Sequence, residues 1–202
     1  MPDQVEYYNR FGELYRDDIL ACPHPELWTT DYEEHGRVYK EMVERIKEQT
    51  ALIDEFFSTR EPVLDVGCGF GRQAIVLARK GFSVIGLDSS KTFVEIAREL
   101  FQRHNLVGEF FNNRLEDLPL SQFSQIILFD VIEHILPPDR QKFLNKIHSY
   151  CRAGGTVIFS LPHVKRRITS KVNNSFRKKI TQHFPYFIAR EEHPYPIPTS
   201  HD

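Results

Sequence analysis

Cysteine is scarce in this chain of 202 residues, and long apolar runs are lacking. The three cysteines, Cys22, Cys68 and Cys151, form an odd and widely spaced set, which makes neither a disulfide framework nor a metal knuckle. No apolar run approaches the roughly 18–20 residues of a membrane span, and the opening residues, MPDQVEYYNR, lack the apolar core of a signal peptide. We therefore expect a soluble, cytoplasmic protein.

Charge is nearly balanced over the whole chain, with 26 Lys and Arg against 28 Asp and Glu, so a global case for nucleic-acid binding fails. Residues 164–181, however, carry seven bases and no acid, whereas residues 1–61 carry seven bases and fifteen acids. The basic segment predicts an amphipathic helix that can rest on an anionic membrane surface or steer RNA or a phosphate-bearing substrate. A simply solvated helix face is the alternative. Apolar residues recur there at every fourth position: Val164, Ile168, Val172, Phe176 and Ile180.

Short apolar segments alternate with segments of helical periodicity, which is typical of an α/β protein. We predict strands at 63–66, 83–87, 107–111, 125–129 and 156–160, and helices at 5–14, 38–57, 73–80, 90–103 and 138–151. This order predicts a Rossmann-like, mostly parallel sheet of five strands with helices on both faces. Ligands of such sheets bind beyond the carboxyl ends of the strands, so the residues that follow each strand are the candidate site.

A glycine-rich turn follows the first predicted strand, in residues 63–71 (VLDVGCGFG). Glycine permits positive φ and a close approach of the backbone to a ligand. The dinucleotide fingerprint G-x-G-x-x-G would need glycine where Arg72 stands, and Asp65 precedes the turn. A carboxylate there repels a pyrophosphate but attracts an ammonium or sulfonium group. Asp88 ends the next strand, where an acid can accept hydrogen bonds from both ribose hydroxyls. A cationic adenosyl ligand therefore fits both Asp65 and Asp88.

Five motifs in order resemble those of class I S-adenosylmethionine-dependent methyltransferases. They are 63–71 (VLDVGCGFG), 84–90 (VIGLDSS), 115–120 (LEDLPL), 129–135 (FDVIEHI) and 152–163 (RAGGTVIFSLPH). The resemblance implies a methyltransferase with S-adenosyl-L-methionine as its cofactor. It divides the chain into a helical lid segment (1–60), a cofactor-binding core (61–162), and a basic helix with a Pro-rich tail (163–202), all within one domain.

The same resemblance assigns cofactor contacts to individual residues. It implies that Asp65, Gly67 and Gly69 hold the methionine end, that Asp88 holds the ribose, and that Phe129 lies beside the methionine moiety. It also implies that Ser89, Leu115 and Glu116 contact the adenine. Structural roles are the alternative: the glycines can serve a tight turn alone, Asp88 can cap the following helix, and a buried Leu115 needs no ligand.

The segment Asp130-Val131-Ile132-Glu133-His134 resembles the ExxEH element of ubiquinone-pathway O-methyltransferases and small-RNA 2′-O-methyltransferases. That element binds magnesium or a related divalent ion near the accepting hydroxyl, which makes Asp130, Glu133 and His134 candidate metal ligands. Positions i, i+3 and i+4 converge across one helical turn, although Asp130 is shorter than the family's Glu. Two alternatives stay open: Glu133 and His134 are catalytic without a metal, with His134 as general base, or the pair only orders the loop.

The two ends of the chain complete the prediction. The aromatic opening, with Tyr7 and Tyr8, resembles a lid over the cofactor that can shield a sulfonium by cation–π contact; core packing is the alternative. The family normally adds a β-hairpin after the fifth strand, and we expect it to be missing here because about 20 residues follow the basic helix. The tail or a second copy, in a homodimer, would then cover the open sheet edge.

The sequence therefore predicts methyl transfer, most simply to an oxygen of a small molecule. An RNA 2′-O-methyltransferase and a cofactor-binding protein without catalysis are the alternatives.

Overall fold

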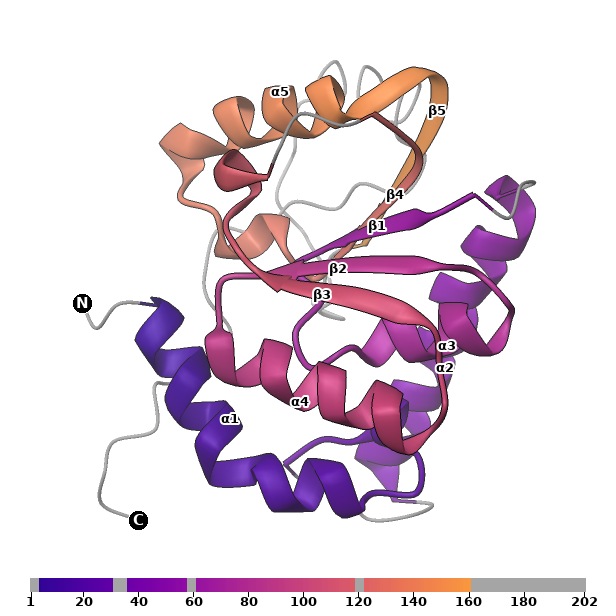
Figure 1. The fold of residues 1–202 in the computed structure, drawn as a ribbon, viewed down its shortest axis with the longest axis vertical. Coiled ribbons are helices and arrows are strands. Elements are labelled where there is room, and N and C mark those ends of the chain that lie inside the picture. The colour runs from indigo at the N-terminus through magenta and orange to yellow at the C-terminus, as the bar shows by residue number, and fades with distance from the viewer. Residues whose placement is uncertain (1–3, 31–35, 58–60, 119–121, 161–202) are drawn as a thin grey trace, which may run out of the picture.

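The computed structural model describes residues 4–30, 36–57, 61–118 and 122–160. Five parallel strands form one sheet in the order β3-β2-β1-β4-β5 (Figure 1). The strands are β1 (Val63–Val66), β2 (Val84–Asp88), β3 (Gly108–Asn112), β4 (Phe123–Phe129) and β5 (Cys151–Ser160). The helices are α1 (Gln4–Ala21), α2 (Arg37–Phe56), α3 (Arg72–Arg79), α4 (Lys91–Arg103) and α5 (Arg140–Tyr150). Four 3-10 turns join them: η1 (Pro25–Leu27), η2 (Leu115–Asp117), η3 (Ile132–His134) and η4 (Pro137–Asp139). The predicted Rossmann-like class is confirmed.

Helices cover the two faces of the sheet unequally. In Figure 1, α1 to α4 lie on one side of the strands and α5 lies on the other. Alternate strand residues divide between two apolar clusters, as side chains of successive strand residues must. Val84 and Ile127 pack in the cluster of α3 and α4, whereas Leu87 and Ile126 pack in the cluster of α5. Every residue of β1 and β4 is buried, which accounts for the mostly apolar character of both strands.

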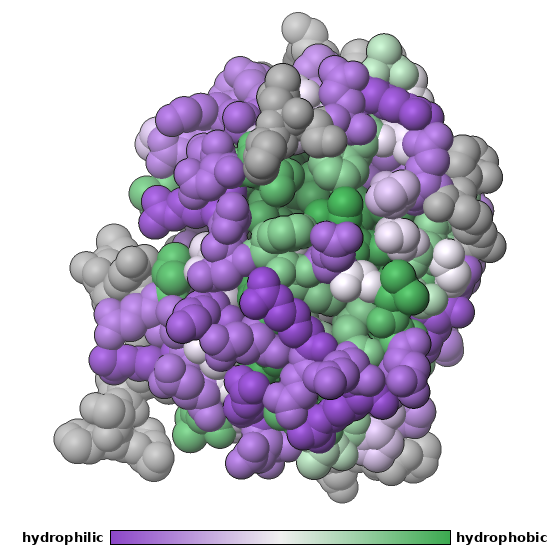
Figure 2. Space-filling view, in the orientation of Figure 1, coloured by the Kyte–Doolittle hydropathy of each residue, from purple (hydrophilic) through white to green (hydrophobic). Residues whose placement is uncertain are grey.

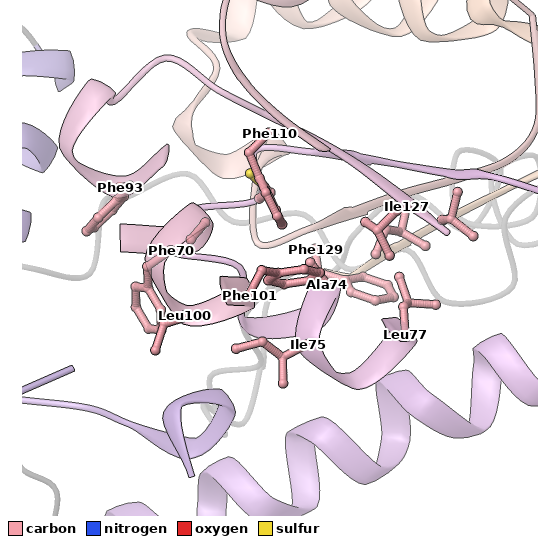
Figure 3. Packing of buried hydrophobic residues seen from close by; sticks show 14 of the residues in the cluster. Phe70, Ala74, Ile75, Leu77, Phe93, Leu100, Phe101, Phe110, Ile127 and Phe129 are labelled. Atoms are coloured by element: carbon pink, nitrogen blue, oxygen red, sulfur yellow. The ribbon is translucent and has the colours of Figure 1, made fainter. Parts of the chain in front are cut away.

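Aromatic rings fill the core between the sheet and α4. Figure 3 shows Phe101 of α4 and Phe110 of β3 in this cluster, and their ring centroids lie 4.6 Å apart with the planes at 72°. Edge-on pairs of this kind add to the stabilisation that area burial gives. Gly86 of β2 lies under Phe110, because a Cβ at this position would come within 2.4 Å of the ring. Glycine therefore permits the close packing of β2 against this aromatic layer.

Apolar residues remain at the surface beside the outer strand β3. Val107 is 74% exposed and Phe111 is 37% exposed. Figure 2 shows hydrophobic surface at the level of the strands, between the polar residues of α5 and α4. The described part of the connection between β3 and β4 contains a 3-10 turn, η2, in place of a longer helix. This face of the sheet is consequently less covered than the face that carries α1 to α4.

Two element boundaries differ from the prediction by more than two residues. Helix α1 was expected to end at residue 14, but it continues to Ala21 because Tyr15 packs against Trp28, with 5.5 Å between ring centroids, and Ile19 is fully buried. Strand β5 begins at Cys151 rather than at residue 156. Its first half pairs with β4 through a bulge, and Gly154 within it has φ +77°. The glycine pair that indicates a turn thus lies inside a bulged strand.

Tyr150 is fully buried at the end of α5 and fastens η2 to it. The single hydrogen of its hydroxyl is shared between the carbonyl oxygens of Leu118 (2.6 Å) and Leu115 (3.1 Å). We expect Tyr150→Phe to lower the free energy of unfolding by about 1–3 kcal/mol, because buried carbonyls lose their donor. Urea denaturation measures the change. Ser149→Ala, an exposed position on the same helix, should shift it by less than about 0.5 kcal/mol, and an equally small shift for Tyr150→Phe would contradict the prediction.

Several predictions lie outside the described residues. They are the basic helix over 164–181, the Pro-rich tail, the expected absence of a C-terminal hairpin, and any contact with RNA or an anionic membrane through the basic helix. Within the described part of the chain, none of the helices is both long and apolar enough to cross a membrane.

Candidate functional site

The turn between β1 and α3 has the backbone that its glycines predict. Gly67 has φ +72° and Gly69 has φ +54°, both in the left-handed region that side chains with a Cβ disfavour. The Gly67 N–H donates to the carbonyl oxygen of Leu87 at 2.7 Å, which ties the turn to β2. A Cβ on Gly67 would lie 2.6 Å from Val131. The glycine turn therefore packs directly against the segment that follows β4, where the candidate catalytic residues lie.

Two acids stand at the carboxyl ends of neighbouring strands, as predicted. Asp65 is 3% exposed, and its Oδ2 atom has no hydrogen-bond partner. Burial, and secondly the charge of Asp88, raise the pKa of Asp65 to about 7. Asp88 accepts hydrogen bonds from the backbone N–H groups of Ser90 (2.8 Å) and Gly69 (2.9 Å). Burial raises the pKa of Asp88, although these two donors oppose the change. A buried acid with an unpartnered oxygen beside a left-handed glycine turn fits a cationic ligand.

The other predicted cofactor residues lie at the carboxyl ends of strands or after them. Ser89 is exposed, and its carbonyl oxygen accepts from the Asn112 side chain at 2.9 Å. Leu115 and Glu116 lie on η2, with Leu115 buried against α5 and Glu116 exposed. Phe129 is 8% exposed and belongs to the cluster of α3 and α4. Their contacts with adenine and with the methionine moiety stay predictions.

The three predicted metal ligands do not come together. Asp130 precedes η3 in the chain. Its φ of +58° places it in the left-handed region and not in an α-helical turn. Its Oδ2 atom accepts a hydrogen bond from Arg45 Nη1 at 2.9 Å. The expected convergence of positions i, i+3 and i+4 assumed one helical turn, and Asp130 lies outside the 3-10 turn that holds Glu133 and His134. Across the described residues, no group of three His, Cys, Asp or Glu side chains forms a metal site. As arranged here, Asp130, Glu133 and His134 do not fit a divalent ion.

Glu133 is the most unusual carboxylate of this segment. Both of its side-chain oxygens are buried, and neither has a hydrogen-bond partner from another residue. Burial raises the pKa of Glu133 to about 7 and the charge of Asp130 adds to the rise, while the backbone N–H of Glu133 itself, Arg45 and Arg140 oppose it. A buried acid whose pKa lies near neutral pH, in a segment that packs against the glycine turn, is a candidate proton acceptor.

His134 meets a tyrosine from the N-terminal helix. The Tyr8 hydroxyl oxygen lies 3.3 Å from Nε2 and 3.4 Å from Nδ1 of His134, and the two ring planes are at 89°. Burial raises the pKa of Tyr8, so its hydroxyl keeps its proton. The aromatic opening of the chain thus reaches the candidate site, where a lid residue was expected.

Residues of α2 that the sequence does not single out reach the same region. Besides Arg45, Gln49 is buried there and donates from Nε2 to Ser160 Oγ at 2.8 Å, while its Oε1 accepts from Gln73 of α3. These side chains join α2 to the carboxyl ends of β4 and β5. In the sequence they appear as ordinary polar positions of an amphipathic helix, so no local signal marks them.

Arg72 has a structural role. It stands where the dinucleotide fingerprint has its third glycine. Its guanidinium donates to the carbonyl oxygens of Trp28 (2.8 Å) and Glu26 (3.0 Å) and lies over the Phe70 ring, 5.1 Å from the centroid. Burial lowers the pKa of Arg72 to about 10. The residue ties the segment after α1 to the first turn of α3.

Comparison with known proteins agrees with this geometry. Residues 63–155 match the family model described as a methyltransferase domain. This part of the chain therefore resembles a methyltransferase domain in sequence as well as in fold. The chain is also 26% identical over 162 residues to a carboxy-S-adenosyl-L-methionine synthase of Yersinia enterocolitica, an alignment that covers 72% of this chain and 60% of that protein. The chain thus spans about 60% of the length of the curated relatives that it matches.

Solved structures of other proteins share the fold of this chain. Magnesium protoporphyrin IX methyltransferase of Synechocystis, determined with bound S-adenosylmethionine, superposes with a TM-score of 0.63 at 20% identity, covering 92% of this chain and 86% of that one. A protein of Pyrococcus horikoshii gives a TM-score of 0.59 at 22% identity over 85% of this chain and 68% of that one. The solved structures confirm the predicted fold, and the family match supports the predicted methyltransferase domain.

Proposed function

We propose that the protein transfers a methyl group from S-adenosyl-L-methionine to an oxygen of a small molecule. The supporting observation is Glu133, whose two carboxylate oxygens have no partner from another residue and whose pKa stands at about 7. Its segment packs against the glycine turn through Val131, which a Cβ on Gly67 would approach to 2.6 Å. A base in this position can take the proton that a hydroxyl loses when its oxygen is methylated. The likeness of segment 130–134 to ubiquinone-pathway O-methyltransferases also supports this acceptor.

When bound, S-adenosyl-L-methionine supplies a methyl group that is already activated on a positively charged sulfur. The chain's own residues have simpler tasks, because correct positioning gives most of the rate. The unpartnered Oδ2 of Asp65 would attract the cationic group, Asp88 would hold the ribose hydroxyls, and one oxygen of Glu133 would receive the acceptor's proton. His134 and Tyr8, which contact each other, would border the acceptor and keep water away from it. We place the lid in α1, which carries Tyr8.

A second candidate is a reaction that modifies the cofactor itself. It is favoured by the similarity to curated carboxy-S-adenosyl-L-methionine synthases at 26% identity. RNA methylation, membrane contact and a homodimer remain further proposals that depend on residues outside the described ranges.

Calorimetric titration with S-adenosylmethionine and S-adenosylhomocysteine tests the proposed cofactor site. We expect micromolar binding of both. Mass spectrometry of reactions with a panel of phenols and alcohols then tests the acceptor, and a mass increase of one methyl group on a hydroxyl compound supports the proposal. A modified cofactor with unmodified acceptors would favour the second candidate. Cofactor binding with neither product would leave a binding protein without catalysis.

Cofactor affinity should depend on pH through Asp65. Its raised pKa of about 7 means that the carboxyl is largely neutral below neutrality and attracts a cation only after losing its proton. Affinity for S-adenosylmethionine should therefore fall about tenfold between pH 8 and pH 6. Titrations at both values measure the change, and Asp65→Asn should remove most of it. A wild-type affinity that is equal at both pH values would contradict the assignment.

A further inference from the structure

Asn9 of α1 begins a chain of hydrogen bonds that ends at the glycine turn. Its Oδ1 atom accepts two hydrogen bonds from the start of α4, from Ser90 Oγ at 2.8 Å and from the backbone N–H of Thr92 at 3.2 Å. The first four N–H groups of a helix have no partner within the helix. Asn9 therefore caps α4 from another helix, 81 residues away in the sequence.

Ser90 links Asn9 to Asp88 because it forms hydrogen bonds with both. It is fully buried, and its Oγ accepts from the backbone N–H of Phe93 at 3.2 Å as the N-cap of α4. A hydroxyl has one hydrogen, and donating it to Asn9 leaves the oxygen lone pairs for Phe93. The backbone N–H of Ser90 donates to Asp88 Oδ1 at 2.8 Å, and Asp88 Oδ2 accepts from Gly69 at 2.9 Å. The Asp88 carboxylate is thus held at both oxygens.

Close packing on both sides fixes Asn9 in this place. One turn along α1, Gly12 approaches α4 so closely that a Cβ on it would lie 2.8 Å from Thr92 Cγ2. The rings of Tyr8 and Phe11 pack on Phe93, with centroid separations of 5.7 Å and 6.1 Å. The contact between Asn9 and Ser90 is consequently part of a tight helix–helix interface, and a solvent molecule cannot easily replace the Asn9 side chain.

We propose that Asn9 is a positioning residue for the cofactor: through Ser90 it holds the loop that carries Asp88 in the conformation that binds the ribose. The inference rests on the proposed cofactor site. Without Asn9, the Ser90 hydroxyl is buried with no acceptor and turns to another partner, which disturbs the N-cap and the backbone N–H that holds Asp88. Affinity is lost because Asp88 must then be ordered when the cofactor binds. Cofactor binding in turn strengthens the docking of α1.

The test compares affinity for S-adenosylhomocysteine in wild type, Asn9→Ala and Asn9→Asp by calorimetry. We expect Asn9→Ala to weaken binding by about tenfold. Asn9→Asp keeps an acceptor oxygen at the N-terminus of α4 and should stay within about threefold of wild type. Glu13→Ala, an exposed change on the same helix, serves as the matched control and should bind like wild type. Thermal unfolding without ligand is recorded for each variant.

A purely structural role is distinguished by two results. If Asn9→Ala lowers the melting temperature but leaves the dissociation constant unchanged, the inference is overturned. The second result comes from Ser90→Ala: if Asn9 acts through Ser90, adding Asn9→Ala to this variant should weaken binding little further, whereas an undiminished tenfold loss would overturn the proposed route. Wild-type protein that binds no cofactor would overturn the proposed function and this inference together. Normal wild-type binding with an unaffected Asn9→Ala would overturn this inference alone.

Discussion

Glu133→Gln should slow methyl transfer by about 10²- to 10⁴-fold, the usual contribution of a positioned base. Glutamine keeps the shape of the side chain but cannot take a proton from the acceptor. In the wild type, kcat should rise as pH increases through about 7, because burial raises the pKa of Glu133 to that value and only the ionised form accepts a proton. Steady-state kinetics with the best acceptor from the panel measure both effects, and the rise with pH should disappear in the variant.

Comparison with His134→Ala separates the two candidate bases. Loss of turnover in His134→Ala together with normal turnover in Glu133→Gln would transfer the role of base to His134. Both variants should bind S-adenosylhomocysteine nearly as well as wild type, which shows that the cofactor site is intact. Glu109→Gln, an exposed change on β3, is the control for altered charge.

Asp88→Ala should weaken cofactor binding by about 10- to 150-fold, equivalent to about 1.5–3 kcal/mol for lost hydrogen bonds to a charged group. The loss has two physical sources. The variant has no acceptor for the ribose hydroxyls, and the N–H groups of Gly69 and Ser90 lose the carboxylate that now joins the two loops. Calorimetry with S-adenosylhomocysteine measures the affinity.

The control for Asp88→Ala is Asp139→Ala, an exposed acid on η4, which should leave affinity unchanged. Equal affinity of wild type and Asp88→Ala would refute the ribose assignment. A melting temperature lowered without loss of affinity would assign Asp88 a purely structural role in joining the two loops.

The sheet and the glycine turn were predictable because their signals are local. Continuous apolar residues indicate a strand buried on both faces, and glycines followed by helical periodicity indicate the turn into α3. The positions of Asp65 and Asp88 then follow from the rule that the carboxyl ends of parallel strands share one edge. Such features need no knowledge of distant contacts.

The failed and missed predictions depend on contacts between distant segments. The prediction that three metal ligands converge in the segment after β4 assumed a helical turn. Asp130 instead has a left-handed backbone and pairs with Arg45, 85 residues earlier. Asn9 contacts Ser90 across a similar distance in the sequence, and nothing in its own neighbourhood distinguishes it from a surface asparagine. The bulge in β5 was missed because the glycines that permit it also indicate a turn.

The hydrogen bonds of Arg72 have a consequence for where this protein can be cut. Sequence similarity to the methyltransferase domain begins at residue 63, but the guanidinium of Arg72 is solvated by carbonyl oxygens of Glu26 and Trp28, and Trp28 covers the ring of Phe70. A fragment trimmed to the matching residues would expose that cation's apolar surroundings and leave the rings of α4 without their outer layer. An expression fragment of this domain should therefore keep the N-terminal helices, which the family match does not include.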